Sequence, residues 1–463
     1  MKRLSKNILS LFSADIARRL FGFISVAYLA RVLGKEGFGE VNLGFAVLAY
    51  VMVLGAAGFP TLGTKKIAQG ASPELAGSVI GSRLMVTMIV LIVVVSAVLT
   101  TVHNTTLMGL LIVFSCAVLP QIFFVDWFFQ GKETLGIVSV ARVMQSVVYL
   151  AVVLIFVRTI NDILWVAVGS VAGECLASVL LFIRFRVSQN GVHIRIKPSL
   201  HLLKQAIPLA AGIVLTTLVI NFPSIALGIF TTASNVGTYS AASKLVYFLL
   251  MGDRILVLLL LPASARKYSD SPETFNHMLT DAMRWILIVS LPIAVGGVLI
   301  ANKLIAIIYG AEYSSSVAVF QVFIWYFFMT MIHTVYSAGL IGVGGEKSYG
   351  KIMLLTAFAY LVCVSAGVCL FGAIGAAFGV VIAESISVVL MKYALQRIIP
   401  LYTPEKILRV ILSVAMMAVC VAAAIPLGLL WGILFGAGCY SLLLVLLRAV
   451  VWNDIKILKT RFL

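Results

Sequence analysis

Two adjacent arginines, Arg18 and Arg19, lie in the first long apolar stretch of the chain, about 11 residues past Asn7. At a rise of about 1.5 Å per residue, this spacing places both guanidinium groups near the middle of a bilayer. A mid-membrane arginine costs at least about 2.5 to 3.5 kcal/mol, so it must face a water-filled cavity or a partner. Together with Lys244 and Arg254, in a later apolar stretch, these residues predict a cationic cavity that accepts an anion.

Neighbouring polar residues leave alternatives to this interpretation open. Asp15 lies three and four residues before Arg18 and Arg19, so it can pair with one of them on the same helix face, and it is also a candidate for ion coupling. Lys244 lies only a few residues into its apolar stretch and can instead extend to the outer interface. Asn221 is the polar side chain of its own stretch that we expect to face the cavity.

Two glutamates near mid-membrane, Glu174 and Glu384, lie in segments that resemble each other. Gly, Val, Glu, Val and Leu coincide at one fixed offset between Gly169–Leu180 and Gly379–Leu390. A carboxyl group that changes protonation as a cavity opens to one side or the other suits coupling to H⁺ or Na⁺. The repeat itself somewhat favours the alternative, a protonated glutamate that bridges helices within each half of the chain, because structure is what duplications usually share.

Other kinds of chemistry are not indicated. The six cysteines lie in or at the ends of apolar stretches without metal-ligand spacing, which is typical of small hydrophobic residues. The segment Gly344–Ser348 lacks the spacing of a phosphate-binding loop. His333, alone in its stretch, is expected to form a structural hydrogen bond. The sequence predicts a non-enzyme without cofactor or metal, driven by an ion gradient, the membrane potential or substrate consumption.

The composition indicates which elements carry these groups. The 463 residues are 62% hydrophobic and only 11% charged, with a mean hydropathy of +1.12, so we expect an all-α polytopic membrane protein. The first apolar segment is followed directly by another, so no cleavable leader is expected. Fourteen apolar segments are long enough to cross a bilayer, with approximate limits 8–31, 41–62, 79–100, 107–129, 136–158, 163–183, 204–228, 238–262, 284–308, 316–342, 352–371, 375–395, 406–427 and 430–450.

The distribution of basic residues predicts the orientation. Lys and Arg accumulate in short cytoplasmic loops, and most of the 34 basic residues fall in loops on the side of the N-terminus. We therefore expect both termini in the cytoplasm. The net charge of +17 follows from this topology and from contact with anionic lipids, and nucleic acid is not an expected partner. On the opposite side lie Arg31, Lys35, Arg158 and Lys303.

The repeat also predicts the domain organisation. Besides the two glutamate segments, Leu33–Gly39 is weakly similar to Thr231–Tyr239. Repeats of this kind commonly build transporters whose site lies between the two halves. We expect an N-terminal six-helix lobe at 1–186, a cytoplasmic linker at 187–203, a C-terminal six-helix lobe at 204–400, and a terminal helix pair with a cytoplasmic tail at 401–463.

Several phrases, in this order and spacing, resemble the polysaccharide-type flippases of the multidrug/oligosaccharidyl-lipid/polysaccharide (MOP) exporter superfamily, relatives of O-antigen and exopolysaccharide repeat-unit translocases. They extend over nearly the whole chain and comprise Ala30–Gly39, Gly58–Pro60, Lys65–Ala68, Trp127–Glu133, Val236–Leu245 and Gly372–Ala377.

The resemblance implies a MATE-like fold with a central cavity, working by alternating access. It implies that the cargo is a polyprenyl-diphosphate-linked oligosaccharide, moved from the cytoplasmic to the outer leaflet of a bacterial inner membrane. Membrane lipids, H⁺ or Na⁺, and a polysaccharide polymerase are the implied partners. Relatives use cationic residues of the first and eighth spans, where Arg18, Arg19, Lys244 and Arg254 lie.

Three other functions remain as alternatives. A lipid II flippase would need the same kind of cationic cavity. A drug or cation exporter would be expected to line its cavity with acidic and aromatic groups, whereas the first span here carries excess positive charge. A membrane glycan polymerase or ligase usually needs a sizeable extracytoplasmic loop, and the outer loops of this chain are short.

Overall fold

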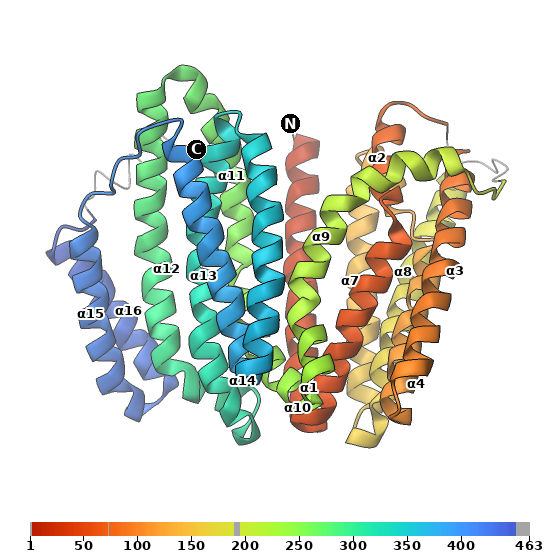
Figure 1. Cartoon of the computed structure of the whole chain (residues 1–463), viewed down its shortest axis with the longest axis horizontal. Helices are drawn as coiled ribbons and strands as arrows, with labels where there is room; N and C mark the ends of the chain where they lie inside the picture. The colour runs from red at the N-terminus through yellow and green to blue at the C-terminus, as the bar shows by residue number, and fades with distance from the viewer. Residues whose placement is uncertain (1, 73, 189–194, 451–463) are drawn as a thin grey trace. The chain divides into compact units, whose positions relative to one another are not determined.

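The computed structural model describes residues 2–72, 74–188 and 195–450, with side chains from Ile16 onward. Within these residues every regular element is helical (Figure 1). Eleven helices are long and apolar enough to cross a membrane. Two of them, α1 (Lys2–Ala56) and α14 (Glu346–Gln396), contain a glycine with positive φ, Gly34 at 65° and Gly372 at 59°.

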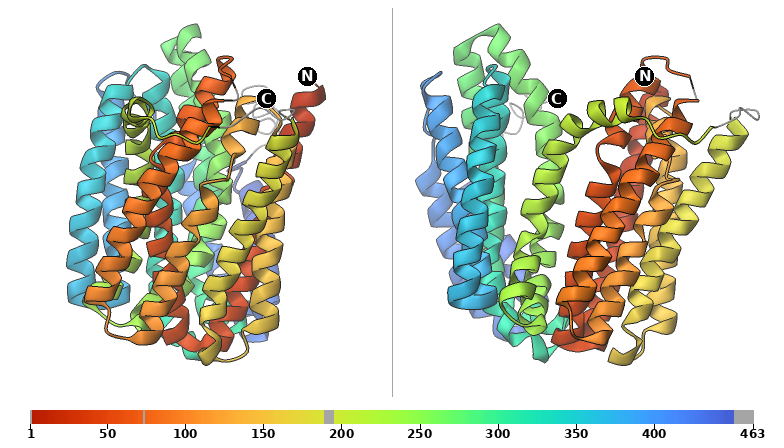
Figure 2. Two further views of the ribbon diagram at one scale, coloured as in Figure 1. Left: turned by 90° about the vertical axis from the view of Figure 1, so that its right-hand side faces the viewer. Right: turned by 45° about the vertical axis from the view of Figure 1, so that its right-hand side comes forward.

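The backbone is non-helical at both glycines, and Figures 1 and 2 show that the two halves of α1 and of α14 run in opposite directions, so each of these helices crosses twice. A side chain at such a φ is strained, which is why glycine lies at the turn. The short apolar helices α4 (Thr105–Cys116) and α5 (Val118–Gln121) add one further crossing. The described residues therefore hold fourteen crossings, and the predicted all-α membrane fold is confirmed.

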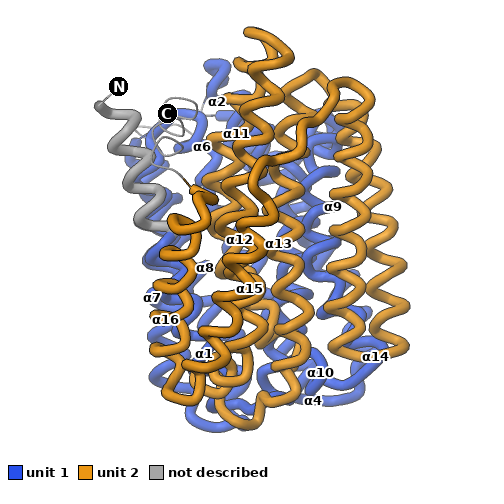
Figure 3. The backbone as a smooth tube through the Cα atoms, turned by 90° about the vertical axis from the view of Figure 1, so that its left-hand side faces the viewer, with its two compact units in different colours: residues 1–237 blue, residues 238–463 orange. Residues whose placement is uncertain are grey.

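The helices cluster into two compact units, residues 1–237 and 238–463 (Figure 3). Besides α1, α4 and α5, the first unit contains α2 (Phe59–Ala68), α3 (Leu75–Thr101), α6 (Asp126–Gly131), α7 (Leu135–Phe156), α8 (Leu164–Ser188) and α9 (Leu200–Phe230). The second contains most of α10 (Ala233–Leu249), then α11 (Met251–Asp270), α12 (Pro272–Ile308), α13 (Ser315–Gly342), α14, α15 (Ile407–Ala424) and α16 (Leu429–Leu446).

The division between the units differs from the lobe boundary that the repeat suggests. Helix α9 packs against α1, α2 and α3, so contacts place it in the first unit. The Tyr50 hydroxyl, for example, donates to the Leu218 carbonyl at 3.0 Å. Contacts therefore divide the chain after α9, whereas the repeat places the linker before it, at 187–203, and the lobes drawn from the repeat stay a prediction.

Helices α2 and α6, which carry phrases of the family resemblance, pack on each other in the first unit. A Cβ at Gly63 of α2 would lie 2.5 Å from the Trp127 ring of α6, so the two helices meet where Gly63 has no side chain. The Thr64 hydroxyl lies 3.2 Å from the Trp127 carbonyl, to which it donates. Trp127 is fully buried there. Gly63 and Thr64, which lie between the phrases Gly58–Pro60 and Lys65–Ala68, thus join α2 to Trp127 of α6.

In the second unit the two halves of α14 approach closely near their turn. A Cβ on Gly375 would lie 1.8 Å from the carbonyl oxygen of Gly367, a separation that no side chain tolerates. The pair α15 and α16 packs against α12, where the Tyr440 hydroxyl donates to the Ile288 carbonyl at 2.7 Å. A terminal helix pair is thus present.

Candidate functional site

Arg18 and Arg19 lie in the first half of α1, on a helix whose other side chains at this level are apolar. Both arginines are half-buried, while Leu20 and Ile24 nearby are each 48% exposed. The side chain of Asp15 lies outside the described residues, so its predicted pairing and its coupling role stay predictions.

The other predicted cavity groups lie on three helices. Asn221 is half-buried on α9, and its amide donates to the Thr217 carbonyl at 2.9 Å, one turn earlier. Lys244 is half-buried on α10 among buried neighbours, and Arg254 is exposed near the start of α11. Arg18, Arg19 and Asn221 belong to the first unit, and Lys244 and Arg254 belong to the second. The single cationic cavity stays a prediction.

Glu174 joins three helices of the first unit. Glu174 lies on α8 and is 8% exposed. Its carboxylate accepts two hydrogen bonds from side-chain amides. Gln121 of α5 donates to one oxygen at 2.6 Å, and Gln145 of α7 donates to the other at 2.5 Å. Each carboxylate oxygen therefore has a neutral amide donor, and the glutamate bridges helices within its own unit.

A second charged group lies close to Glu174. Arg142 of α7 pairs with Asp126 of α6 at 2.8 Å, and Gln130 donates to the same carboxylate oxygen at 3.0 Å. Arg83 of α3 is 4% exposed and donates to the Phe124 carbonyl at 3.3 Å. Arg142 is within electrostatic range of Glu174.

Sequence reasoning did not single out Arg83 and Arg142, although both fall inside the predicted spans 79–100 and 136–158, and the structure places both within long helices. The signal that could have identified them is an arginine within an apolar helical stretch, the same signal that singled out Arg18 and Arg19.

Glu384 joins two helices of the second unit. It is buried on α14 and lies 2.6 Å from Nδ1 of His333 on α13, so His333 has a hydrogen bond, as expected. Asp253 of α11 accepts a hydrogen bond from Thr334, the next residue of α13. Asp253 is also within electrostatic range of both His333 and Glu384. Three helices therefore bring an imidazole and two carboxyl groups together.

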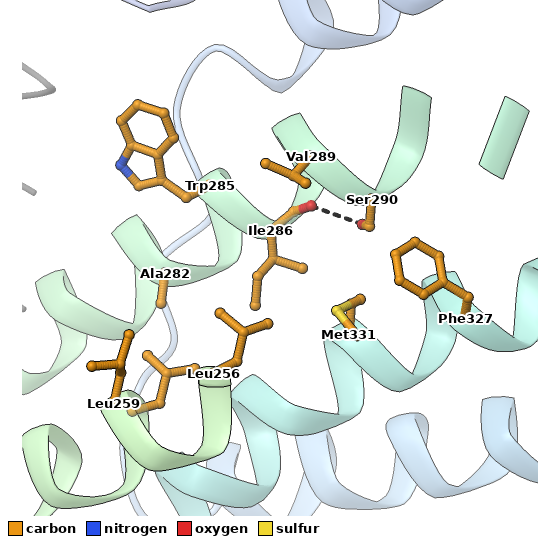
Figure 4. A pocket seen from close by; sticks show the side chains of 10 residues that line it. Leu256, Leu259, Ala282, Trp285, Ile286, Val289, Ser290, Phe327 and Met331 are labelled. Atoms are coloured by element: carbon orange, nitrogen blue, oxygen red, sulfur yellow. Dashed lines mark hydrogen bonds between the residues drawn. The ribbon is translucent and has the colours of Figure 1, made fainter. Parts of the chain in front are cut away.

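An apolar cavity of about 290 Å³ lies between α11, α12 and α13. Figure 4 shows Leu256, Ile286 and Met331 converging on it from the three helices, and the Ser290 hydroxyl turned back to the carbonyl of Ile286. Among residues 2–72, 74–188 and 195–450, no group of three or more His, Cys, Asp or Glu side chains could hold a metal ion.

Comparison with known sequences gives matches over more than half of the chain. The family model described as "Polysaccharide biosynthesis protein" matches residues 4–266. A candidate O-antigen transporter of Shigella dysenteriae is 25% identical over 403 residues, which cover 85% of this chain and 100% of that protein.

Solved structures share the fold. An inward closed conformation of the lipid II flippase MurJ aligns with a TM-score of 0.75 at 15% identity, covering 95% of this chain and 99% of that one. An inward-facing multidrug resistance MATE family transporter of the MOP superfamily aligns with a TM-score of 0.67 at 15% identity, over 84% of this chain and 98% of that one. The predicted MATE-like fold is confirmed.

Proposed function

Because this chain belongs to the polysaccharide biosynthesis protein family, we propose that it is a flippase for a polyprenyl-diphosphate-linked oligosaccharide. It moves this lipid from the cytoplasmic to the outer leaflet of a bacterial inner membrane. The observation that carries the proposal is the alignment with the whole length of a candidate O-antigen transporter. The fold shared with MurJ is compatible with a lipid-linked cargo but leaves the cargo open.

The residues suit the headgroup of such a lipid. A diphosphate carries about two negative charges, and transferring it bare into hydrocarbon is prohibitive, so the protein must replace its water. Arginine is always charged and binds phosphate oxygens in bidentate fashion. Half-buried Arg18 and Arg19 on an apolar helix supply such donors in the first unit, and Lys244 and Arg254 supply further positive charge in the second.

The transport step is alternating access. The chain holds two compact units of similar size, and in transporters built from repeated halves the substrate site opens in turn to each side of the membrane. Because the headgroup binds both when the site is open to the cytoplasm and when it is open to the outside, transport requires only a shift of population between these two states. The oligosaccharide polymerises after transport, which makes a polysaccharide polymerase the expected downstream partner.

The test replaces Arg18 and Arg19 of α1. In a strain whose own copy is deleted, R18Q/R19Q should export little surface glycan. A hydrogen bond to a charged group contributes about 1.5 to 3 kcal/mol, so each arginine lost should slow transport about 10- to 100-fold. Surface glycan is measured beside the amount of protein in the membrane, with R158Q as control, since Arg158 is exposed in the turn after α7.

Four outcomes contradict part or all of the proposal. Normal surface glycan in R18Q/R19Q would remove the phosphate role of these residues. A deletion strain that keeps its surface glycan would point to another function. Rescue of a strain depleted of its lipid II flippase would indicate peptidoglycan precursor as cargo, and increased tolerance to cationic drugs would indicate an exporter.

A further inference from the structure

The two glutamates of the repeat have partners of different chemistry, and we propose that His333 and Glu384 form the proton-binding site of this transporter. Glu174, at the matching position of the first unit, is then a structural residue. The inference rests on the proposed function, because it names the ion that drives the same transport cycle. It assigns a site for H⁺ to one unit only.

The two glutamates lie at matching places in the order of the spans. Glu174 belongs to the sixth crossing and receives a hydrogen bond from Gln121, at the end of the fourth. Glu384 belongs to the twelfth crossing and contacts His333 in the tenth. In both units, therefore, a buried carboxyl group reaches the helix two crossings earlier. The difference is the partner, which is an amide in one unit and an imidazole in the other.

The surroundings of Glu174 are suited to one fixed protonation state. Each of its oxygens accepts from an amide NH₂ group, Gln121 at 2.6 Å and Gln145 at 2.5 Å. A side-chain amide neither gains nor loses a proton, and Arg142 nearby is always charged. Adding a proton to the carboxylate would weaken the hydrogen bonds from both amides, because a neutral carboxyl group is a weaker acceptor than a carboxylate. This arrangement holds α5, α7 and α8 together without taking part in proton transfer.

The surroundings of Glu384 allow one proton to be gained and lost. Nδ1–H of neutral His333 donates to the carboxylate, and the pair then carries one negative charge. Uptake of one proton from water on the other ring nitrogen, Nε2, gives an imidazolium–carboxylate pair with no net charge. Release to water on the opposite side restores the first state. The side chains are 14% and 11% exposed, so they are partly accessible.

Charged and titratable side chains surround the His333–Glu384 pair, so a change in the charge of the pair affects other helices of the second unit. From α11, Asp253 lies within electrostatic range, held by Thr334 and adjacent to Arg254. Two tyrosines, Tyr326 of α13 and Tyr349 of α14, also lie within electrostatic range of Glu384.

Helix α12 faces this level of α13 across the apolar cavity of Figure 4, lined by Ile286, Val289 and Ser290. Because α11 carries both Asp253 and Arg254, a change of charge at His333–Glu384 acts on the helix that holds a candidate headgroup ligand.

The direct test measures protonation without cargo. Full-length protein in lipid bilayers is titrated over about pH 5 to 8, the range in which imidazole groups change charge, and infrared difference spectra report imidazole and carboxyl bands. The four other histidines contribute a background common to all variants, so we expect the component that belongs to the pair in the wild type and in E174Q, and its loss in H333Q and in E384Q. Survival of this component in both H333Q and E384Q, or its disappearance in E174Q, overturns the inference.

The second arm measures transport. Glycan export driven by an imposed pH difference should depend on that difference in the wild type and become independent of it in H333Q. If E384Q does not accumulate in the membrane, both the titration and the transport measurement are made with H333Q. A titrating signal at the pair in a protein that exports no glycan would overturn the proposed function while the proton site stands, so the two failures are distinguishable.

Discussion

Charged side chains buried in the first unit are tolerated because each has a partner. Asp126 is 6% exposed and accepts from Arg142 at 2.8 Å and from Gln130 at 3.0 Å. Arg83, also buried, donates to a backbone carbonyl and lies within electrostatic range of Asp126. A buried charge left without a partner is strongly destabilising. The carboxylate of Asp126 is therefore the central acceptor of this group.

Replacing Asp126 tests this role. D126N removes the charge that Arg142 and Arg83 face, so we expect the free energy of unfolding to fall by about 1 to 3 kcal/mol. Thermal unfolding of the purified protein in detergent measures it. The control is D270N, because Asp270 pairs with Lys267 at 3.5 Å with its side chain 62% exposed, and such surface pairs contribute about 1 kcal/mol or less. Equal effects of the two substitutions would contradict the argument.

Residue type identified some of these groups and not their partners. Arg18, Arg19, Glu174 and Glu384 could be selected because a charge within an apolar stretch is rare and costly. The residues that they contact could not be predicted from the sequence, since Glu174 and Gln121, for example, are 53 residues apart. His333 and Glu384 are separated by 51 residues, and only packing of α13 on α14 brings them together.

At the level of elements, two glycines allow the start of the second half of α1 to meet the start of α10. A Cβ on Gly39 would lie 1.8 Å from the Ala233 carbonyl oxygen, and one on Gly237 would lie 2.0 Å from that of Lys35. These glycines belong to the segments Leu33–Gly39 and Thr231–Tyr239, whose similarity the sequence reveals. The structure adds that they contact each other.

Substitution of Gly39 should therefore loosen this contact. In G39A the added methyl group meets backbone, so we expect a loss of about 1 to 3 kcal/mol in stability, as for overpacking elsewhere. The matched control is G22A, since a Cβ at Gly22 of the same helix has nothing within 4 Å and alanine favours helix by up to about 1 kcal/mol. Thermal melting of both variants decides. A melting temperature of G39A equal to that of G22A would count against the close approach.

Prolines within the apolar spans differ in their effect on the helix. Gly58 has a φ of 78° and separates α1 from α2, with Pro60 in the first turn of the new helix. Pro223 and Pro292, in contrast, lie inside the continuous helices α9 and α12. In a membrane, neighbouring helices can satisfy the backbone groups that a proline frees. Proline alone therefore does not tell whether a span breaks, whereas a glycine at positive φ before it does.

For the whole molecule, the distribution of Lys and Arg over the loops predicts the orientation in the membrane. If both termini are cytoplasmic, cysteines placed at Lys132 and Asp270 should react with an impermeant thiol reagent only from inside. Cysteines at His103 and Arg158 should react only from outside. The experiment starts from a variant without the six native cysteines and compares intact cells with inverted membranes. Labelling of all four positions from the same side would overturn the predicted topology.

The membrane class, the fourteen crossings and the charged residues within apolar segments were predicted from the sequence alone. These follow from local quantities, because a helix is the conformation that satisfies the backbone in lipid and its length is set by bilayer thickness. Which carboxyl group meets an imidazole and which meets two amides was decided only by tertiary packing. Hydrogen bonds form between atoms close in space, and residues far apart in the chain reach that distance only when their helices pack.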